Sequence, residues 1–199
     1  MIPISLTLQG VYSYKKKQTI DFSRLTKAGL FGIFGATDTG KSAIIESISY
    51  ALYGETERIN KVENRYYNMM NLQSNELLID FECMSESNNT FYRFVVKGKR
   101  SKKQFENVYK YDHSYYKKSD SAWVPIPAID VKNEITGLSY EHFKRTVIIP
   151  QGKFMEFLHL KPVERTKMLK EIFNLHAFDL SDKTKSLYSS TKEQHALLQ

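Results

Sequence analysis

Alternation of apolar and polar residues predicts antiparallel strands in the first half of the chain. Residues 2–8 alternate, and residues 20–22 repeat the pattern after a polar stretch at 14–18. We therefore expect two paired strands at the N-terminus. Residues 77–82 and 91–96 are strand-like runs separated by a polar segment, which predicts a hairpin.

Two continuous apolar runs predict strands of a different kind. Residues 30–34 (LFGIF) have the composition of a central strand that is covered on both faces, and the run stops at Gly35. Residues 146–149 (TVII) are expected to form a second buried strand, which Pro150 ends. Both runs favour a sheet with helices on its faces, and hence an α/β fold.

Helical spacing of apolar residues follows the first of these runs. Residues 41–53 place their apolar side chains on one face, and Gly54 stands where a C-terminal cap belongs. Short helices are expected at residues 129–135 and 140–144. A longer helix is expected between Pro162 and Asn174, because proline favours the first turn of a helix.

Composition narrows the class of protein. The 199 residues are 41% hydrophobic and 26% charged, which is typical of a globular protein. The single cysteine, Cys83, excludes an internal disulfide and a four-thiolate zinc site and suits a reducing compartment. The chain has neither a secretory signal nor a run of 18 apolar residues, so we expect a soluble, cytoplasmic protein with no membrane contact.

The strongest chemical signal is the segment GATDTGKS at residues 35–42, which matches the phosphate-loop motif G-x-x-x-x-G-K-[ST]. A chance glycine-rich turn would not need the predicted strand and helix on either side. In such loops backbone N–H groups surround the β-phosphate, the lysine reaches the β and γ oxygens, and the hydroxyl ligates Mg²⁺. We therefore predict that the chain binds ATP and Mg²⁺. The predicted nucleotide-binding residues are Gly35, Ala36, Thr37, Asp38, Thr39, Gly40, Lys41 and Ser42.

A phosphate-loop hydrolase also needs a group that holds Mg²⁺ from a neighbouring strand. Asp80 has the required form, because it follows an apolar run. The alternation of residues 77–82 instead predicts that Asp80 and Glu82 face solvent on an antiparallel strand. Gln151, which follows the second apolar run, could reach Mg²⁺ and the attacking water through its amide, although glutamine is a poor base.

Three segments carry a family resemblance: residues 35–42, residues 47–54 (SISYALYG) and residues 140–158 (YEHFKRTVIIPQGKFMEFL). With them, the chain resembles the N-terminal ATPase lobe of SbcC-type proteins, which are DNA-repair ATPases in the SMC-like branch of the ATP-binding-cassette (ABC) superfamily. The resemblance implies an α/β phosphate-loop fold with a mixed sheet around the loop's helix and an antiparallel β subdomain. It places the lobe at residues 1–175 and the start of a coiled-coil helix at 176–199.

The resemblance also implies the roles of the site residues. Gln151 becomes the Q-loop glutamine that senses the γ-phosphate and Mg²⁺, so Lys41 and Gln151 are the expected catalytic residues and Ser42 and Gln151 the expected metal ligands. All nine glycines are isolated, so the Ser-Gly-Gly signature loop of ABC proteins is missing from this sequence. The resemblance places that loop and the acidic Mg²⁺ ligands in a C-terminal lobe, and makes this chain half of a bipartite head.

The implied function is that of an ATP-hydrolysing subunit of a DNA double-strand-break repair and nuclease complex. Its expected partners are its own C-terminal lobe, a second head in a homodimer, an SbcD-type nuclease subunit and DNA. ATP-dependent head engagement would gate DNA binding and the nuclease, and the isolated chain would be nearly inactive. Two alternatives remain open: an ATP-dependent dimerisation module of another SMC-like or RecF-like complex, and a self-contained phosphate-loop kinase that uses Asp80.

Two further surfaces have open interpretations. Relatives often carry Asn or Arg in the turn after the first strand, whereas this chain has GVYSY at residues 10–14, so Tyr12 or Tyr14 either stacks on adenine or covers the sheet edge. The net charge of +7 favours a polyanionic partner. The basic segments 15–17 and 97–103 either contact the DNA backbone or form a solvated hairpin face.

Overall fold

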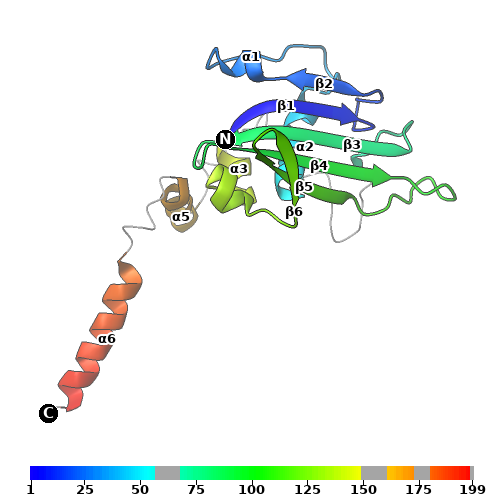
Figure 1. Cartoon of the computed structure of the whole chain (residues 1–199). Helices are drawn as coiled ribbons and strands as arrows, with labels where there is room; N and C mark the ends of the chain where they lie inside the picture. The colour runs from blue at the N-terminus through cyan, green and yellow to red at the C-terminus, as the bar shows by residue number, and fades with distance from the viewer. Residues whose placement is uncertain (57–67, 149–160, 173–179, 198–199) are drawn as a thin grey trace. The chain divides into compact units, whose positions relative to one another are not determined.

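A computed structural model describes residues 1–56, 68–148, 161–172 and 180–197. The chain divides into two compact units, Met1–Phe143 and Lys144–Gln199. The first unit holds the sheet and the phosphate-loop segment, and the described part of the second includes two longer helices (Figure 1).

One antiparallel sheet of six strands forms the body of the first unit, with the strand order β2-β1-β3-β4-β5-β6 (Figure 1). The strands are β1 (Ile2–Gln9), β2 (Gln18–Asp21), β3 (Glu76–Ser85), β4 (Thr90–Lys99), β5 (Asp112–Ser119) and β6 (Ala122–Ile126). Each described pair of neighbours is antiparallel. The N-terminal strand pair and the β3–β4 hairpin confirm the predictions made from alternation.

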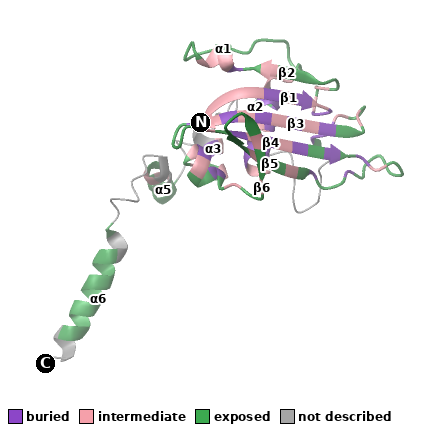
Figure 2. Cartoon of the chain, viewed as in Figure 1, coloured by how far each residue is buried: buried purple, intermediate pink, exposed green. Residues whose placement is uncertain are grey.

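Helix α2 (Lys41–Tyr53) covers one face of this sheet. It packs against β3 and β4, where Phe81 and Phe94 stand opposite each other and are almost completely buried. In Figure 2 the buried residues run along the central strands and the helix behind them. Gly54 ends the helix with a left-handed φ of 66°, and its N–H donates to the Tyr50 carbonyl, as the sequence predicted.

Three short helices are described in the first unit, and the last of them continues past its boundary at Phe143. They are α1 (Ser23–Thr26), the π-helix η2 (Lys132–Thr136) and α3 (Tyr140–Thr146). The last two lie where short helices were expected. Hydrogen bonds tie η2 to the sheet and to α2: the Ser85 hydroxyl donates to the Glu134 carbonyl, and the Tyr53 hydroxyl lies 2.8 Å from Thr136 Oγ1.

The predicted central strand at residues 30–34 does not form. The segment is irregular, and Leu30 and Phe34 are 87% and 94% exposed. A buried strand needs a hydrogen-bonding neighbour and cover on both faces. No strand among the described residues pairs with this segment, so the apolar composition alone cannot bury it. The described sheet is consequently antiparallel throughout, rather than mixed.

The predicted strand at residues 146–149 is also wrong over its described part. Helix α3 runs through Thr146, and Val147 lies in a turn with 56% of its surface exposed. Buried His142 and Phe143 anchor this helix, so the chain is still helical where the apolar run begins. Ile149 and Pro150 lie outside the described residues.

The second unit contains α5 (Pro162–Ile172) and α6 (Ser181–Leu197). Helix α5 begins at the proline that predicted it, while the expected end at Asn174 lies outside the described residues. In α6 every side chain whose exposure is described is exposed, including Leu187 and Tyr188. Within the described ranges, no helix has both the length and the apolar character that crossing a membrane requires.

Candidate nucleotide-binding site

The phosphate-loop segment leads directly into the N-terminus of α2. Gly40 is the residue before the helix and has a left-handed φ of 93°, and Asp38 also has a positive φ, 63°. Aspartate tolerates this region better than most residues. Residues 31–39 are exposed to solvent. The first N–H groups of a helix lack internal partners and carry the positive end of its dipole, so this exposed end can bind an anion.

Lys41 folds back over the loop that it follows. Its Nζ donates hydrogen bonds to the carbonyls of Gly35 and Ala36, at 2.8 and 2.5 Å. The Thr39 hydroxyl also donates to the Ala36 carbonyl, at 2.8 Å. Ser42 follows in the first turn of α2 and is exposed. The loop thus brings together a cation, a hydroxyl and a helix N-terminus, which are the groups that a magnesium triphosphate needs.

Gln151 lies outside the described residues, so its predicted place beside the loop remains a prediction. The other predicted site residues, 35–42, form one continuous segment. The lysine and the serine therefore stand at the same helix end because of their sequence positions.

The turn after β1 contacts the loop through Ser13 and Tyr14. The sequence pattern did not predict a contact for Ser13. The Ser13 hydroxyl donates to the Asp38 carbonyl at 3.0 Å, and the Tyr14 hydroxyl donates to the Gly40 carbonyl at 3.3 Å. Burial raises the pKa of the half-buried Tyr14 above its usual value. These contacts join residues 25 and 26 positions apart, so no local signal in the sequence could have identified them.

Asp80 lies on the other face of the sheet from α2. Its neighbours Ile79 and Phe81 are completely buried on the α2 side, and successive strand residues point to opposite faces. Arg93 holds both carboxylate oxygens of Asp80, with Nε to Oδ1 at 2.8 Å and Nη2 to Oδ2 at 2.6 Å. The hydrogen bond to Asp80 raises the pKa of the Arg93 guanidinium. Asp80 is therefore half of a surface ion pair, away from the helix that begins at the loop.

The basic segment 97–103 combines one structural arginine with exposed lysines. Arg100 is only 6% exposed and donates to the carbonyls of Ser74, Asn71 and Phe105. Its guanidinium also stacks on the Phe105 ring, 4.2 Å from the centroid. A cavity of about 750 Å³ adjoins this arginine. The exposed lysines that line it are Lys99, Lys102 and Lys103.

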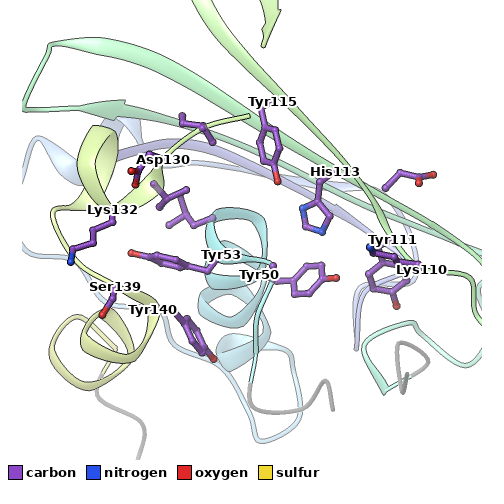
Figure 3. Close-up of a pocket in the computed structure, with 15 residues that line it drawn as sticks. Tyr50, Tyr53, Lys110, Tyr111, His113, Tyr115, Asp130, Lys132, Ser139 and Tyr140 are labelled. Carbon is purple, nitrogen blue, oxygen red and sulfur yellow. The ribbon is translucent and has the colours of Figure 1, made fainter. Parts of the chain in front are cut away.

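A second cavity lies at the opposite end of α2 from the phosphate loop. It has a volume of about 1040 Å³ and opens between the C-terminus of α2, strand β5 and residues 129–140 (Figure 3). Its aromatic lining residues are Tyr50, Tyr53, Tyr111, His113, Tyr115 and Tyr140. Burial raises the pKa of Tyr53 to about 12. Among the described residues, no three His, Cys, Asp or Glu side chains lie together in a group that could hold a metal ion.

Comparison with known proteins places the chain in a family. The AAA domain family matches residues 5–199. The chain therefore belongs to this family of nucleoside-triphosphate-binding domains.

Its relatives are more specific. The chain is 36% identical to the SbcC subunit of the nuclease SbcCD from Clostridium acetobutylicum over 194 residues, which cover 89% of this chain and 15% of the relative. Identity to the protein of the same name from Bacillus subtilis is 35%, over 89% of this chain and 16% of the relative. Identity to the probable DNA double-strand break repair Rad50 ATPase of Aquifex aeolicus is 30%, over 96% of this chain and 18% of the relative.

These relatives confirm the resemblance to the N-terminal ATPase lobe of SbcC-type proteins. The chain spans less than a fifth of the length of each of these three relatives.

Proposed function

We propose that the chain binds ATP with Mg²⁺ at residues 35–42 and acts as half of the ATPase head of a DNA double-strand-break repair and nuclease complex. The observation that carries this proposal is the exposed loop at the N-terminus of α2, with Lys41 folded over it. The names of the relatives, which describe a nuclease subunit and a DNA-repair ATPase, support the biological role.

The residues present fit a magnesium triphosphate. The main-chain N–H groups at the start of α2 would bind phosphate oxygens, and the Lys41 ammonium would exchange its two carbonyl partners for them. The Ser42 hydroxyl and the Gln151 amide would hold the metal. When bound, Mg²⁺ neutralises charge on the phosphates during transfer. Gln151 would orient the attacking water, and Lys41 would stabilise the charge on the γ-phosphate.

The exposed apolar segment beside the loop supports the idea that this lobe is one half of a head. Residues 30–34 have the composition of a central strand, yet no strand among the described residues pairs with them. We propose that a C-terminal lobe covers this segment and supplies the acidic Mg²⁺ ligands. Residues 1–175 would then form the N-terminal lobe of an ABC/SMC-type head, and 176–199 would begin a coiled coil, for which the exposed Leu187 of α6 offers an apolar position.

Two such heads would close on two ATP molecules, and their engagement would control DNA binding and the activity of a partner nuclease. The exposed lysines around Arg100 are the surface most suited to the DNA backbone, because phosphate contacts need charge and no particular base sequence. The geometry of Asp80 argues against a self-contained kinase. The remaining alternative, a dimerisation module without a nuclease, differs only in its partners, so a pull-down that finds no nuclease would favour it.

Lys41→Ala tests the proposed site directly. The substitution should weaken Mg-ATP binding at least tenfold, because it removes a charge-assisted contact to the phosphates. Isothermal titration of the 199-residue chain measures this, with Lys183→Ala in α6 as the matched control for loss of an exposed lysine. Unchanged affinity in Lys41→Ala would contradict the proposed site.

ATP turnover tests the proposal that this chain is half of an ATPase head. The chain alone should bind Mg-ATP but hydrolyse almost none, and hydrolysis should appear when the C-terminal lobe and linear DNA are supplied. Substantial hydrolysis by the chain alone at low concentration would refute this part of the proposal.

Gln151→Ala should separate binding from turnover. Because a water-orienting amide acts on the γ-phosphate rather than on the whole nucleotide, ATP affinity should stay within about twofold while turnover by the completed head falls by at least tenfold. Equilibrium titration and steady-state kinetics on the same preparation measure the two quantities. A parallel loss in both would assign Gln151 to nucleotide binding instead.

A further inference from the structure

Two neighbouring hydroxyl groups, on Ser13 and Tyr14, hold two carbonyls of the phosphate loop. Ser13 donates to the carbonyl of Asp38, and Tyr14 donates to the carbonyl of Gly40. We propose that Ser13 and Tyr14 are positioning residues that aim the N–H groups of the loop at the phosphates. This inference rests on the proposed nucleotide site and adds a phosphate-specific role for the turn after β1.

The planarity of the peptide bond supplies the mechanism. In a trans peptide the C=O and the following N–H point in opposite directions. A hydroxyl that holds the Asp38 carbonyl on the side of the turn therefore directs the N–H of Thr39 to the other side of the loop. The hydroxyl on the Gly40 carbonyl does the same for the N–H of Lys41. Ser13 and Tyr14 thus fix the orientation of two peptide planes of the loop, one between residues 38 and 39 and the other between residues 40 and 41.

The turn that carries these hydroxyls is itself held by main-chain hydrogen bonds. Val11 and Tyr14 exchange two of them, at 3.2 and 2.7 Å, and the Tyr12 N–H donates to the Met69 carbonyl at 2.9 Å. The Asn71 side-chain amide donates to the Tyr12 carbonyl at 2.5 Å. The turn is therefore closed on itself and anchored to the segment before β3, whereas the phosphate loop is exposed. A fixed turn can lower the entropy that the loop loses when it binds an anion.

The Tyr14 ring also packs directly on the loop. A Cβ added to Gly40 would lie 2.8 Å from Tyr14 Cε2, so ring and glycine are in close contact. This contact gives Tyr14 a role at the phosphates, where the sequence had suggested adenine stacking or cover for the sheet edge. The two roles at the nucleotide differ in one respect: only a phosphate role affects a ligand that has no base.

Inorganic tripolyphosphate and ATP, titrated separately with Mg²⁺ against the 199-residue chain, test the proposal. Tyr14→Phe and Ser13→Ala should each weaken both ligands by the same factor, about three- to tenfold, as expected for loss of one hydrogen bond. Ser13→Thr, which retains a hydroxyl, should restore the affinity for both. Tyr109→Phe removes an exposed tyrosine hydroxyl elsewhere and should change neither. Without ligand, the midpoint of thermal unfolding of each variant should stay within a few degrees of the wild-type value. This measurement distinguishes weaker binding from loss of the fold.

The possible results separate the two proposals. If Lys41→Ala loses both ligands while Tyr14→Phe and Ser13→Ala bind normally, the positioning role is wrong and the nucleotide site stands. If Tyr14→Phe is normal and Tyr14→Leu weakens ATP alone, Tyr14 stacks on adenine and the positioning role is again wrong. If the wild type binds neither ligand, the nucleotide site fails and the positioning role fails with it.

Discussion

Gly40 must satisfy two conditions at once. Its φ of 93° is a left-handed value that residues with a side chain rarely adopt, and an added Cβ would lie only 2.8 Å from Tyr14 Cε2. The same residue precedes the first N–H groups of α2. The glycine is therefore required both by the backbone and by its neighbour, at the point where phosphate is proposed to bind.

Gly40→Ala should reduce ATP affinity at least tenfold and lower the free energy of unfolding by about 1–3 kcal/mol. Strain and the contact with Tyr14 would move the loop away from its present position. Gly29→Ala is the matched control, because Gly29 has a φ of 73° but no atom within 4 Å of an added Cβ. Titration and denaturant unfolding of both variants measure the effects. Equal losses in the free energy of unfolding would show that the contact with Tyr14 is unimportant for stability.

At the scale of elements, the β3–β4 hairpin explains why Asp80 follows an apolar run and yet is not placed at a metal site. The alternation that buries Phe81 and Cys83 against α2 turns Asp80 to the other face, where Arg93 from the facing strand binds it. This pair stabilises the hairpin through two charge-assisted hydrogen bonds, but both side chains are partly exposed, so water screens much of their attraction.

Asp80→Asn should lower the free energy of unfolding by about 1 kcal/mol and leave Mg-ATP affinity unchanged. Glu82→Gln offers a matched comparison, because Glu82 meets the same arginine at only 3.7 Å, and its effect on stability should be smaller. Denaturant unfolding and calorimetry provide the two measurements. A loss of nucleotide affinity in Asp80→Asn alone would revive the interpretation of Asp80 as a magnesium ligand.

At the scale of the whole molecule, a thiol on the buried face of the sheet makes the free energy of unfolding depend on pH in the alkaline range. Cys83 is completely buried, and burial raises the pKa of its thiol from 9.0 to about 12. Above pH 9 the unfolded chain loses this proton while the folded chain keeps it, so the unfolded state gains stability as the pH rises. The contribution of the neutral thiol is fully present below about pH 9 and is lost progressively up to about pH 12.

Between pH 9 and 11 the free energy of unfolding of the wild type should therefore fall more steeply than that of Cys83→Ala, by roughly 1.4 kcal/mol per pH unit. Denaturant unfolding at a series of pH values gives both slopes, and the difference between slopes is unaffected by the constant cost of the cavity in Cys83→Ala. Burial also raises the pKa of Tyr53, and because Tyr53 is present in both proteins its contribution to the two slopes is the same. Parallel slopes would mean that the thiol titrates in the folded protein as it does in water.

Local patterns in the sequence predicted much of this architecture because their causes are local. Alternation produces strands with one buried face, and proline and glycine mark the start of α5 and the end of α2. The phosphate loop was recognisable because its chemistry needs a glycine, a lysine and a hydroxyl at fixed spacing in one segment. The two apolar runs were misjudged because a buried strand depends on partners that composition does not supply.

The order of residues was enough to predict a phosphate loop at residues 35–42, and it located the two ends of α2 and the apolar faces of β3 and β4. Three features emerged only from the folded chain: Arg93 engages Asp80, residues 30–34 lie exposed, and Ser13 and Tyr14 reach the loop. The physical reason is the range of the interactions. Backbone preferences act over a few residues, whereas these side-chain contacts join segments 13 to 26 positions apart, which meet only once the sheet has formed.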